Sequence, residues 1–161
     1  MDLFAMIRRT DDIAQILAGL DAVNIDMVEN GGQNLLHTAI AYKKPELGIE
    51  LVKRQIDVNH QDGKGMTPLH YTAWHFSPLL AELILQHGGD PNICDRHGNG
   101  PLWYAIQFAK GHYDLIELLL DAGADVTTRN KHGKSPLDLA GQINDSCLVE
   151  LLTRARTQTP K

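Results

Sequence analysis

Apolar residues recur at helical spacing in several short runs along the chain. LAELIL (residues 80–85) and LIELLL (115–120) set acidic side chains opposite a face of aliphatic ones. Such runs predict amphipathic helices with one buried face. Glycines at positions 88, 89 and 123 follow these runs and are typical of helix C-termini. No apolar run approaches the roughly 20 residues of a membrane span, so none is predicted.

A second, shorter helix signal precedes each amphipathic run. Thr67–Pro68 and Ser135–Pro136 combine a capping hydroxyl with a proline, which suits the first helical turn because no N–H is needed there. In the earliest unit Asn34–Leu35 replaces this pair, and Gly100 replaces the threonine in a later one. Short polar residues that bond their own backbone open the turns before these signals: Asp62, Asp95 and Asn130.

The same phrase recurs at a nearly constant period. GMTPLHYTA begins at Gly65, GQNLLHTAI 33 positions earlier, GNGPLWYAI 33 positions later, and GKSPLDLAG at Gly133. A second phrase follows each of the first three units, as RQIDVN (54–59), GGDPN (88–92) and GADVT (123–127). One turn with two short helices cannot bury its apolar face alone, so the period predicts a stack of units.

These phrases resemble the ankyrin repeat family, whose pattern is G-x-T-P-L-H-x-A-A, an apolar helix, then G-A-D-V-N. The resemblance covers residues 29 to about 155 and identifies an architecture rather than an activity. It implies an all-α solenoid of about five helix-turn-helix units with turn or hairpin tips. We expect one domain, 1–155, that comprises an N-terminal capping unit (1–28), central repeats (29–61, 62–94, 95–129) and a C-terminal capping repeat (130–155), before a frayed tail (156–161).

Two histidines occupy the same position of the repeat, which decides how they are interpreted. His37 and His70 are equivalent, while Trp103 and Asp138 stand there in the other units. A catalytic histidine is not normally duplicated by a repeat period. In the family this histidine bonds backbone of the adjacent unit, so we expect a structural role for both.

Composition narrows the classes of function. The chain has 161 residues and a net charge of −5, which fits one globular domain and disfavours nucleic-acid binding. Its two cysteines, Cys94 and Cys147, form no close pair, and free thiols fit a reducing compartment. Cys147 lies in an apolar helical run, which predicts a buried thiol. The N-terminal residues do not resemble a secretory signal, so we expect a cytoplasmic protein.

Motifs for chemistry are weak or incomplete. HGKS (132–135) lacks the earlier glycine of a phosphate-binding loop, and Cys94 with His97 lacks a second pair at zinc-site spacing. Paired carboxylates, a nucleophile elbow and a cofactor loop do not occur. We therefore expect neither enzymatic activity nor a metal or cofactor.

The resemblance implies a binding groove formed by the turn tips and the exposed ends of the inner helices. Tip residues of the later units are basic, whereas the outer helices carry acidic residues. Tyr42, Trp74 and Phe108 hold equivalent positions in consecutive units, as interface anchors or as rings packed between units. The third unit also has a two-residue insertion near Phe108. Such an insertion lies on a loop and either serves binding or reflects neutral sequence drift, and both interpretations stay open. The expected partner-binding residues are Tyr42, Lys64, Met66, Trp74, His75, Arg96, His97, Asn99, Phe108, Lys131, His132 and Lys134.

The expected function is protein binding by a monomer. The chain resembles small stand-alone bacterial ankyrin proteins, some of which act as immunity proteins that block a toxin. We therefore expect an inhibitor of a partner with an acidic surface, a toxin being the most specific candidate. A general scaffold or regulatory adaptor is the alternative, and metal or nucleic-acid binding ranks below both.

Overall fold

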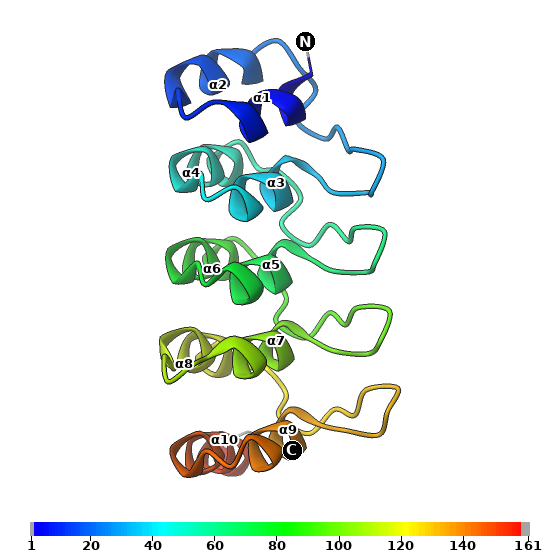
Figure 1. Ribbon diagram of the computed structural model, residues 1–161, viewed down its shortest axis with the longest axis vertical. Helices are drawn as coiled ribbons and strands as arrows, with labels where there is room; N and C mark the ends of the chain where they lie inside the picture. Colours follow the sequence, from blue (N-terminus) through cyan, green and yellow to red (C-terminus); the bar gives the residue numbers. More distant parts are fainter. Residues whose placement is uncertain (1, 159–161) are drawn as a thin grey trace.

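The computed structural model describes residues 2–158, which form ten helices in five antiparallel pairs (Figure 1). The odd-numbered helix of each pair is called the inner helix, because it lies on the side of the projecting loops. The even-numbered helix is the outer one. The helices are α1 (Leu3–Arg9), α2 (Ile13–Leu20), α3 (Leu35–Ala41), α4 (Pro45–Lys53), α5 (Pro68–His75), α6 (Pro78–Gln86), α7 (Pro101–Phe108), α8 (Asp114–Asp121), α9 (Pro136–Ile143) and α10 (Ser146–Gln158).

The pairs stack in chain order, and the loops between them all project from one side of the stack (Figure 1). Inner helices contact inner helices of the next pair, and outer helices α2, α4, α6 and α8 contact one another in the same order. The described residues hold a single isolated β-bridge, between Val28 and Asn34. The prediction of an all-α solenoid with projecting tips is therefore confirmed.

Helix starts follow the capping residues of the repeat phrase. Asn34 caps α3 by accepting the N–H groups of Leu36 and His37 at 3.1 and 3.2 Å. An asparagine thus replaces the Thr-Pro signal without loss of the cap. Thr67 precedes Pro68 at the start of α5, as the phrase predicts, whereas Gly100 gives α7 no side-chain cap.

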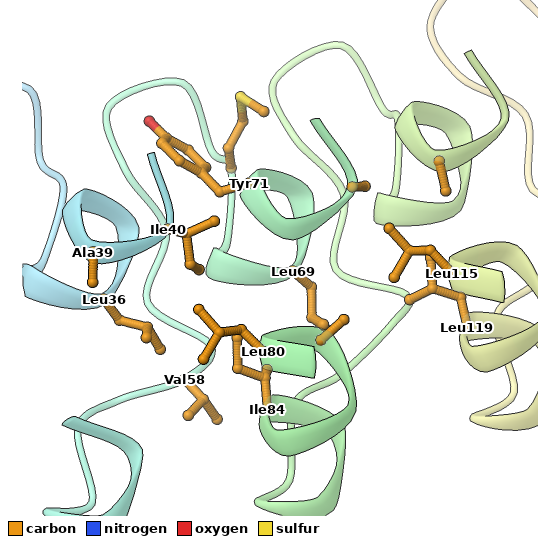
Figure 2. Close-up of a cluster of buried hydrophobic side chains, with 14 of the residues drawn as sticks. Leu36, Ala39, Ile40, Val58, Leu69, Tyr71, Leu80, Ile84, Leu115 and Leu119 are labelled. Carbon is orange, nitrogen blue, oxygen red and sulfur yellow. The ribbon is translucent and has the colours of Figure 1, made fainter. Parts of the chain in front are cut away.

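Buried aliphatic side chains join each layer to the next. Leu36 and Ile40 of α3, Leu69 of α5, and Leu80 and Ile84 of α6 lie together in Figure 2 and are at most 1% exposed. Since the apolar face of one pair is covered by the next, stability comes from contacts between neighbouring units. The continuous core extends from Leu3 to Leu152.

The C-terminal unit departs from two expectations. Helix α10 continues to Gln158, so a frayed tail does not begin at residue 156, and residues 159–161 lie outside the described residues. Cys147 is exposed, so the prediction of a buried thiol was wrong. The buried stripe of α10 runs through Leu148 and Leu152, and the cysteine lies one residue off it.

None of the described helices is long and apolar enough to cross a membrane, in agreement with the hydropathy pattern.

Candidate protein-binding surface

Each tip is a turn closed by one short polar side chain. Asp62 Oδ1 accepts the N–H groups of Lys64 and Met66 at 2.8 and 2.9 Å, and Gly65 takes a positive φ of 79°. Asp95 and Asn130 make the same pair of bonds in the next two tips. The tip conformation is therefore set by an Asx turn and a glycine that tolerates the left-handed region.

Tyrosines of the inner helices hold two of these aspartates in place. Tyr71 donates to Asp62 Oδ2 at 2.9 Å, and Tyr104 donates to Asp95 Oδ2 at 2.7 Å. Burial raises the pKa of Tyr71 to about 12 and raises the pKa of Tyr104 as well. Both hydroxyls therefore remain donors at neutral pH and fix the tips on their helices.

Backbone hydrogen bonds join successive tips into one row. Arg96 N–H donates to Lys64 O at 2.9 Å, and Lys131 N–H donates to His97 O at 2.9 Å. The four residues that make these bonds are exposed. The row consequently presents the exposed side chains of Lys64, Arg96 and Lys131 on three consecutive tips.

Most predicted tip residues are accessible, with one clear exception. Lys64, Arg96, His97, Lys131, His132 and Lys134 are exposed, and Asn99 is partly buried with its Oδ1 accepting from Asn130 Nδ2 at 2.8 Å. Met66 is only 2% exposed, so its prediction as a partner-contacting residue was wrong. Its side chain belongs to the cluster of buried hydrophobic residues that forms the core.

His70 lies in a fully bonded, buried position. The Thr67 N–H donates to His70 Nδ1 at 3.0 Å, so Nε2 carries the proton and donates to Asn99 O at 3.0 Å. His37 Nε2 lies 3.0 Å from Met66 O in the equivalent place. Burial lowers the pKa of His37 to about 4 and also lowers that of His70. This geometry agrees with a structural histidine that ties one unit to the next.

The aromatic side chains at the ends of the inner helices do not form one uniform row. Trp74 and Phe108 are nearly parallel, with 6.4 Å between ring centroids and 8° between planes. His75 stacks on Trp74 at 5.7 Å, and burial is the main cause that lowers its pKa. Tyr42 lies under the guanidinium of Arg8, 5.9 Å from its ring centroid, and so contacts the N-terminal unit.

The tip cations and the aromatic rings lie at opposite ends of the inner helices. Arg96 precedes α7, whereas Phe108 is its last residue. Eight helical residues span about 12 Å, so the tip cations do not flank the rings directly. The groove implied by the resemblance, with basic tips beside the helix ends that carry Trp74 and Phe108, is therefore divided by a helix length.

Three exposed residues near the rings did not appear in the predicted set. Phe76 and Leu79 are 43% and 56% exposed, and Lys110 lies on the loop after Phe108. Phe76 has a positive φ of 50°, and its counterparts Lys43 and Lys110 have φ values of 54° and 47°. Comparison of the repeats at this position could have found Phe76, because the other units carry polar residues there.

Acidic side chains are spread over the outer helices. Glu46, Glu82, Asp114, Glu117 and Asp121 are exposed, and Glu50 pairs with Arg54. In the last tip Arg129 is paired with Asp138 at 3.0 Å and adds less free charge than Lys131 or Lys134. The chain therefore separates a basic row of tips from an acidic outer side.

Residues 2–158 contain no group of side chains arranged as a metal site. No cluster of three or more histidine, cysteine, aspartate or glutamate side chains in that range has an arrangement that could hold a metal ion. Every buried polar side-chain atom there has a hydrogen-bond partner. The arrangement offers surfaces for contact rather than a set of groups poised on one reacting atom.

Comparison with known proteins gives the same picture. Residues 3–93, 36–130 and 77–159 match the family model for ankyrin repeats (3 copies). The chain is 36% identical over 81 residues to NF-kappa-B inhibitor alpha of Sus scrofa. The matched region covers 47% of this chain and 26% of that protein. It is 33% identical over 114 residues to Rabankyrin-5 of Homo sapiens, covering 63% of this chain and 10% of that protein. The chain thus spans about a quarter or less of the length of these relatives, and it belongs to the ankyrin repeat family.

Proposed function

We propose that this chain is a non-enzymatic protein-binding module that holds its partner on the row of tips and on the aromatic residues at the far ends of the inner helices. The observation that carries the proposal is the row itself. Three consecutive tips, bonded backbone to backbone, present Lys64, Arg96 and Lys131 to solvent in a chain of net charge −5. A rigid row of one charge sign fits a partner with the opposite sign.

The partner is a protein with an acidic surface. The exposed cations of the tips steer its approach, since complementary charge chiefly raises the association rate. Trp74, 44% exposed and parallel to Phe108, supplies an amphipathic anchor of the kind that lowers the dissociation rate. Tips and ring thus contribute to different steps of binding.

Inhibition is the form of this function that we favour. NF-kappa-B inhibitor alpha is by its name an inhibitor, and a module with exposed contact surfaces can act by covering its target. In its most specific form the chain is an immunity protein that neutralises a toxin in the cytoplasm, as a monomer when free. A scaffold or regulatory adaptor uses the same surface and is the alternative.

Quantitative affinity capture from the native cells tests the proposal. The bait is the wild-type chain, the tip variant Arg96→Glu/Lys131→Glu, or the outer-helix variant Glu46→Lys/Glu82→Lys, which changes as many charges on the other side. We expect a protein that the wild-type and outer-helix baits retain and the tip variant loses. Retention by the tip variant with loss by the outer-helix variant would place the site on the opposite side.

A second arm separates inhibition from adaptor function. The captured protein is expressed in host cells with the wild-type chain or with the tip variant. An immunity protein protects the cells only when the tips are intact, whereas an adaptor leaves growth unchanged in both.

A further inference from the structure

Exposed apolar side chains concentrate at one corner of the stack, where α5 turns into α6. Trp74, Phe76 and Leu79 are 44%, 43% and 56% exposed within six consecutive residues. The other large exposed hydrophobic residues of the described chain belong to separate units: Val28, Tyr42 and Ile143. Single exposed apolar residues are ordinary on a protein surface, but a local concentration marks a contact site.

Phe76 has no role in the fold that explains its identity. It follows α5 with φ 50° and ψ 70°, a left-handed conformation that bulky residues rarely adopt. The equivalent positions carry Lys43, Lys110 and Asn144, all polar. Since the ring is neither buried nor suited to its backbone, folding alone does not account for it. An unfavourable residue held in an exposed place points to function.

Two hollows lie on either side of Phe76. The first, of about 210 Å³, is lined by Trp74, Phe76, Phe108, Lys110 and His112 among others. The second, of about 290 Å³, lies towards the preceding unit and includes Lys43 and Leu80 in its lining. His75 and Phe76 line both hollows and separate them.

The linings of these hollows carry basic side chains, one of which, Lys44, is paired with Asp11. Lys43 and Lys110 stand at the two sides, and both are exposed. Neither lining contains an acidic side chain. The surface therefore combines an aromatic floor with flanking cations, which favours an apolar side chain whose neighbours are acidic.

The two-residue insertion enlarges this corner. Five residues, 109–113, join α7 to α8, whereas only residues 76 and 77 join α5 to α6. Two of the three additional loop residues are the insertion, and the third arises because α8 begins one residue later in its repeat than α6. The added loop carries Lys110 and His112, and the His112 ring lies 5.3 Å from the ring of Phe76. The insertion thus supplies one wall of the first hollow.

From these observations we propose that the corner surface, defined by Lys43, Trp74, Phe76, Phe108, Lys110 and His112, binds a short acidic segment of a partner protein that carries an aromatic side chain. The aromatic ring enters the hollow between Phe76 and Phe108, where edge and face contacts with both rings are available. Acidic neighbours of that ring pair with Lys110 and Lys43. This inference builds on the proposed protein-binding function, but its surface lies a helix length away from the tips.

The test follows backbone amide signals of the isotope-labelled chain during titration with synthetic peptides. The probe is an acetylated pentapeptide with a central phenylalanine and two acidic residues on each side. The control peptide has lysines in place of the acidic residues. We expect the acidic peptide at millimolar concentration to shift the amides of residues 74–79 and 108–112, and the lysine peptide to leave them unchanged.

Phe76→Asn is the decisive variant, because asparagine suits the left-handed conformation and the chain keeps its fold. We expect it to weaken peptide binding by at least about tenfold, whereas Ile143→Asn, at another exposed apolar site, leaves binding unchanged. Unshifted corner amides, or equal binding by Phe76→Asn, would overturn the inference.

The tip variant Arg96→Glu/Lys131→Glu separates this inference from the proposed function. It should bind the peptide as the wild-type chain does, since the corner surface includes neither residue. Shifts confined to the tip amides would assign the acidic segment to the tips and remove the corner site. Trp74 belongs to both surfaces, so the two proposals are told apart by the residues that they do not share. Failure of the Phe76→Asn test removes the corner site and leaves capture through Arg96 and Lys131 of the tips intact.

Discussion

The imidazole of His70 donates through Nε2 to the backbone carbonyl of Asn99, 3.0 Å away in the following repeat. Its Nδ1 accepts the N–H of Thr67 at the start of its own helix. One neutral side chain therefore caps a helix and joins two units. A residue with both ring nitrogens committed in this way has no free atom for catalysis.

Replacing His70 with alanine should lower the free energy of unfolding by about 1–3 kcal/mol. The buried Thr67 N–H loses its acceptor, while Asn99 O keeps a second bond from the Asp95 N–H. Urea denaturation followed by circular dichroism measures the change. His97→Ala is the matched control, because that side chain is exposed and should alter stability by less than about 0.5 kcal/mol. Equal stability of the two variants would contradict the structural role of His70.

Stability should fall as the pH decreases from about 6.5 towards 4. Burial holds the folded-state pKa of His37 at about 4, below the ordinary 6.5, and lowers that of His70. The unfolded chain therefore binds protons that the folded chain excludes, and the contribution is fully present only above pH 6.5. Linkage gives a loss of about 2 kcal/mol at pH 5 for His37 alone.

Urea midpoints at pH 7, 6 and 5 measure this dependence. Glutamine at both positions, His37→Gln/His70→Gln, removes the two most buried titrating groups and should reduce the slope between these pH values, leaving the contribution of His75. A wild-type midpoint that is unchanged between pH 7 and pH 5 would show that the two histidines are not held neutral.

Gly100→Thr should stabilise the chain by about 0.5 kcal/mol. Gly100 has φ −86° and ψ 174°, close to the −90° and 168° of Thr67, and an added Cβ would meet nothing nearer than 3.6 Å. Gly98→Thr is the paired control two residues away. Its φ of 81° and a Cβ contact of 3.1 Å to Asn130 make threonine unfavourable, so it should destabilise by about 1 kcal/mol or more. Thermal unfolding of both variants should therefore shift in opposite directions.

The repeat period was sufficient to predict the stack, because each short phrase specifies a cap, a helix and a turn locally. The equivalence of His37 and His70 likewise assigned their role before any contact was known. Burial of single side chains was harder to predict. The apolar run around Cys147 predicts a buried thiol, but the helical period places Leu148 and Leu152 on the buried face and leaves Cys147 exposed.

The direction of single side chains and the distance between residues of one unit could not be predicted from the sequence. Met66 follows the tip glycine directly, yet the turn directs its side chain into the core. Arg96 and Phe108 belong to the same unit, but they lie at opposite ends of α7. Phe76 was missed because the family's binding positions stop at the end of the inner helix, whereas its exposed ring lies one residue beyond.

Trp74→Ala should accelerate dissociation of the captured partner by about 30-fold, equivalent to about 2 kcal/mol. Trp74 is 44% exposed in the free chain, so its replacement should weaken the complex more than it lowers the stability of the free chain. Biolayer interferometry with the partner immobilised gives the rate. Ile143→Ala, at a site 46% exposed on α9, should leave it unchanged. If Trp74→Ala instead lowers stability without altering dissociation, its ring serves contacts between units.

The central claim is that the tips bind an acidic protein, and association kinetics at two salt concentrations test it most directly. The captured partner is measured with the wild-type chain, with Arg96→Glu/Lys131→Glu and with Glu46→Lys/Glu82→Lys. We predict that wild-type association slows as salt rises, because exposed charges are screened beyond about 10 Å at 0.1 M ionic strength. Tip reversal should slow association strongly at low salt, and outer-helix reversal should not slow it. Slower association after outer-helix reversal, with unchanged association after tip reversal, would contradict the account.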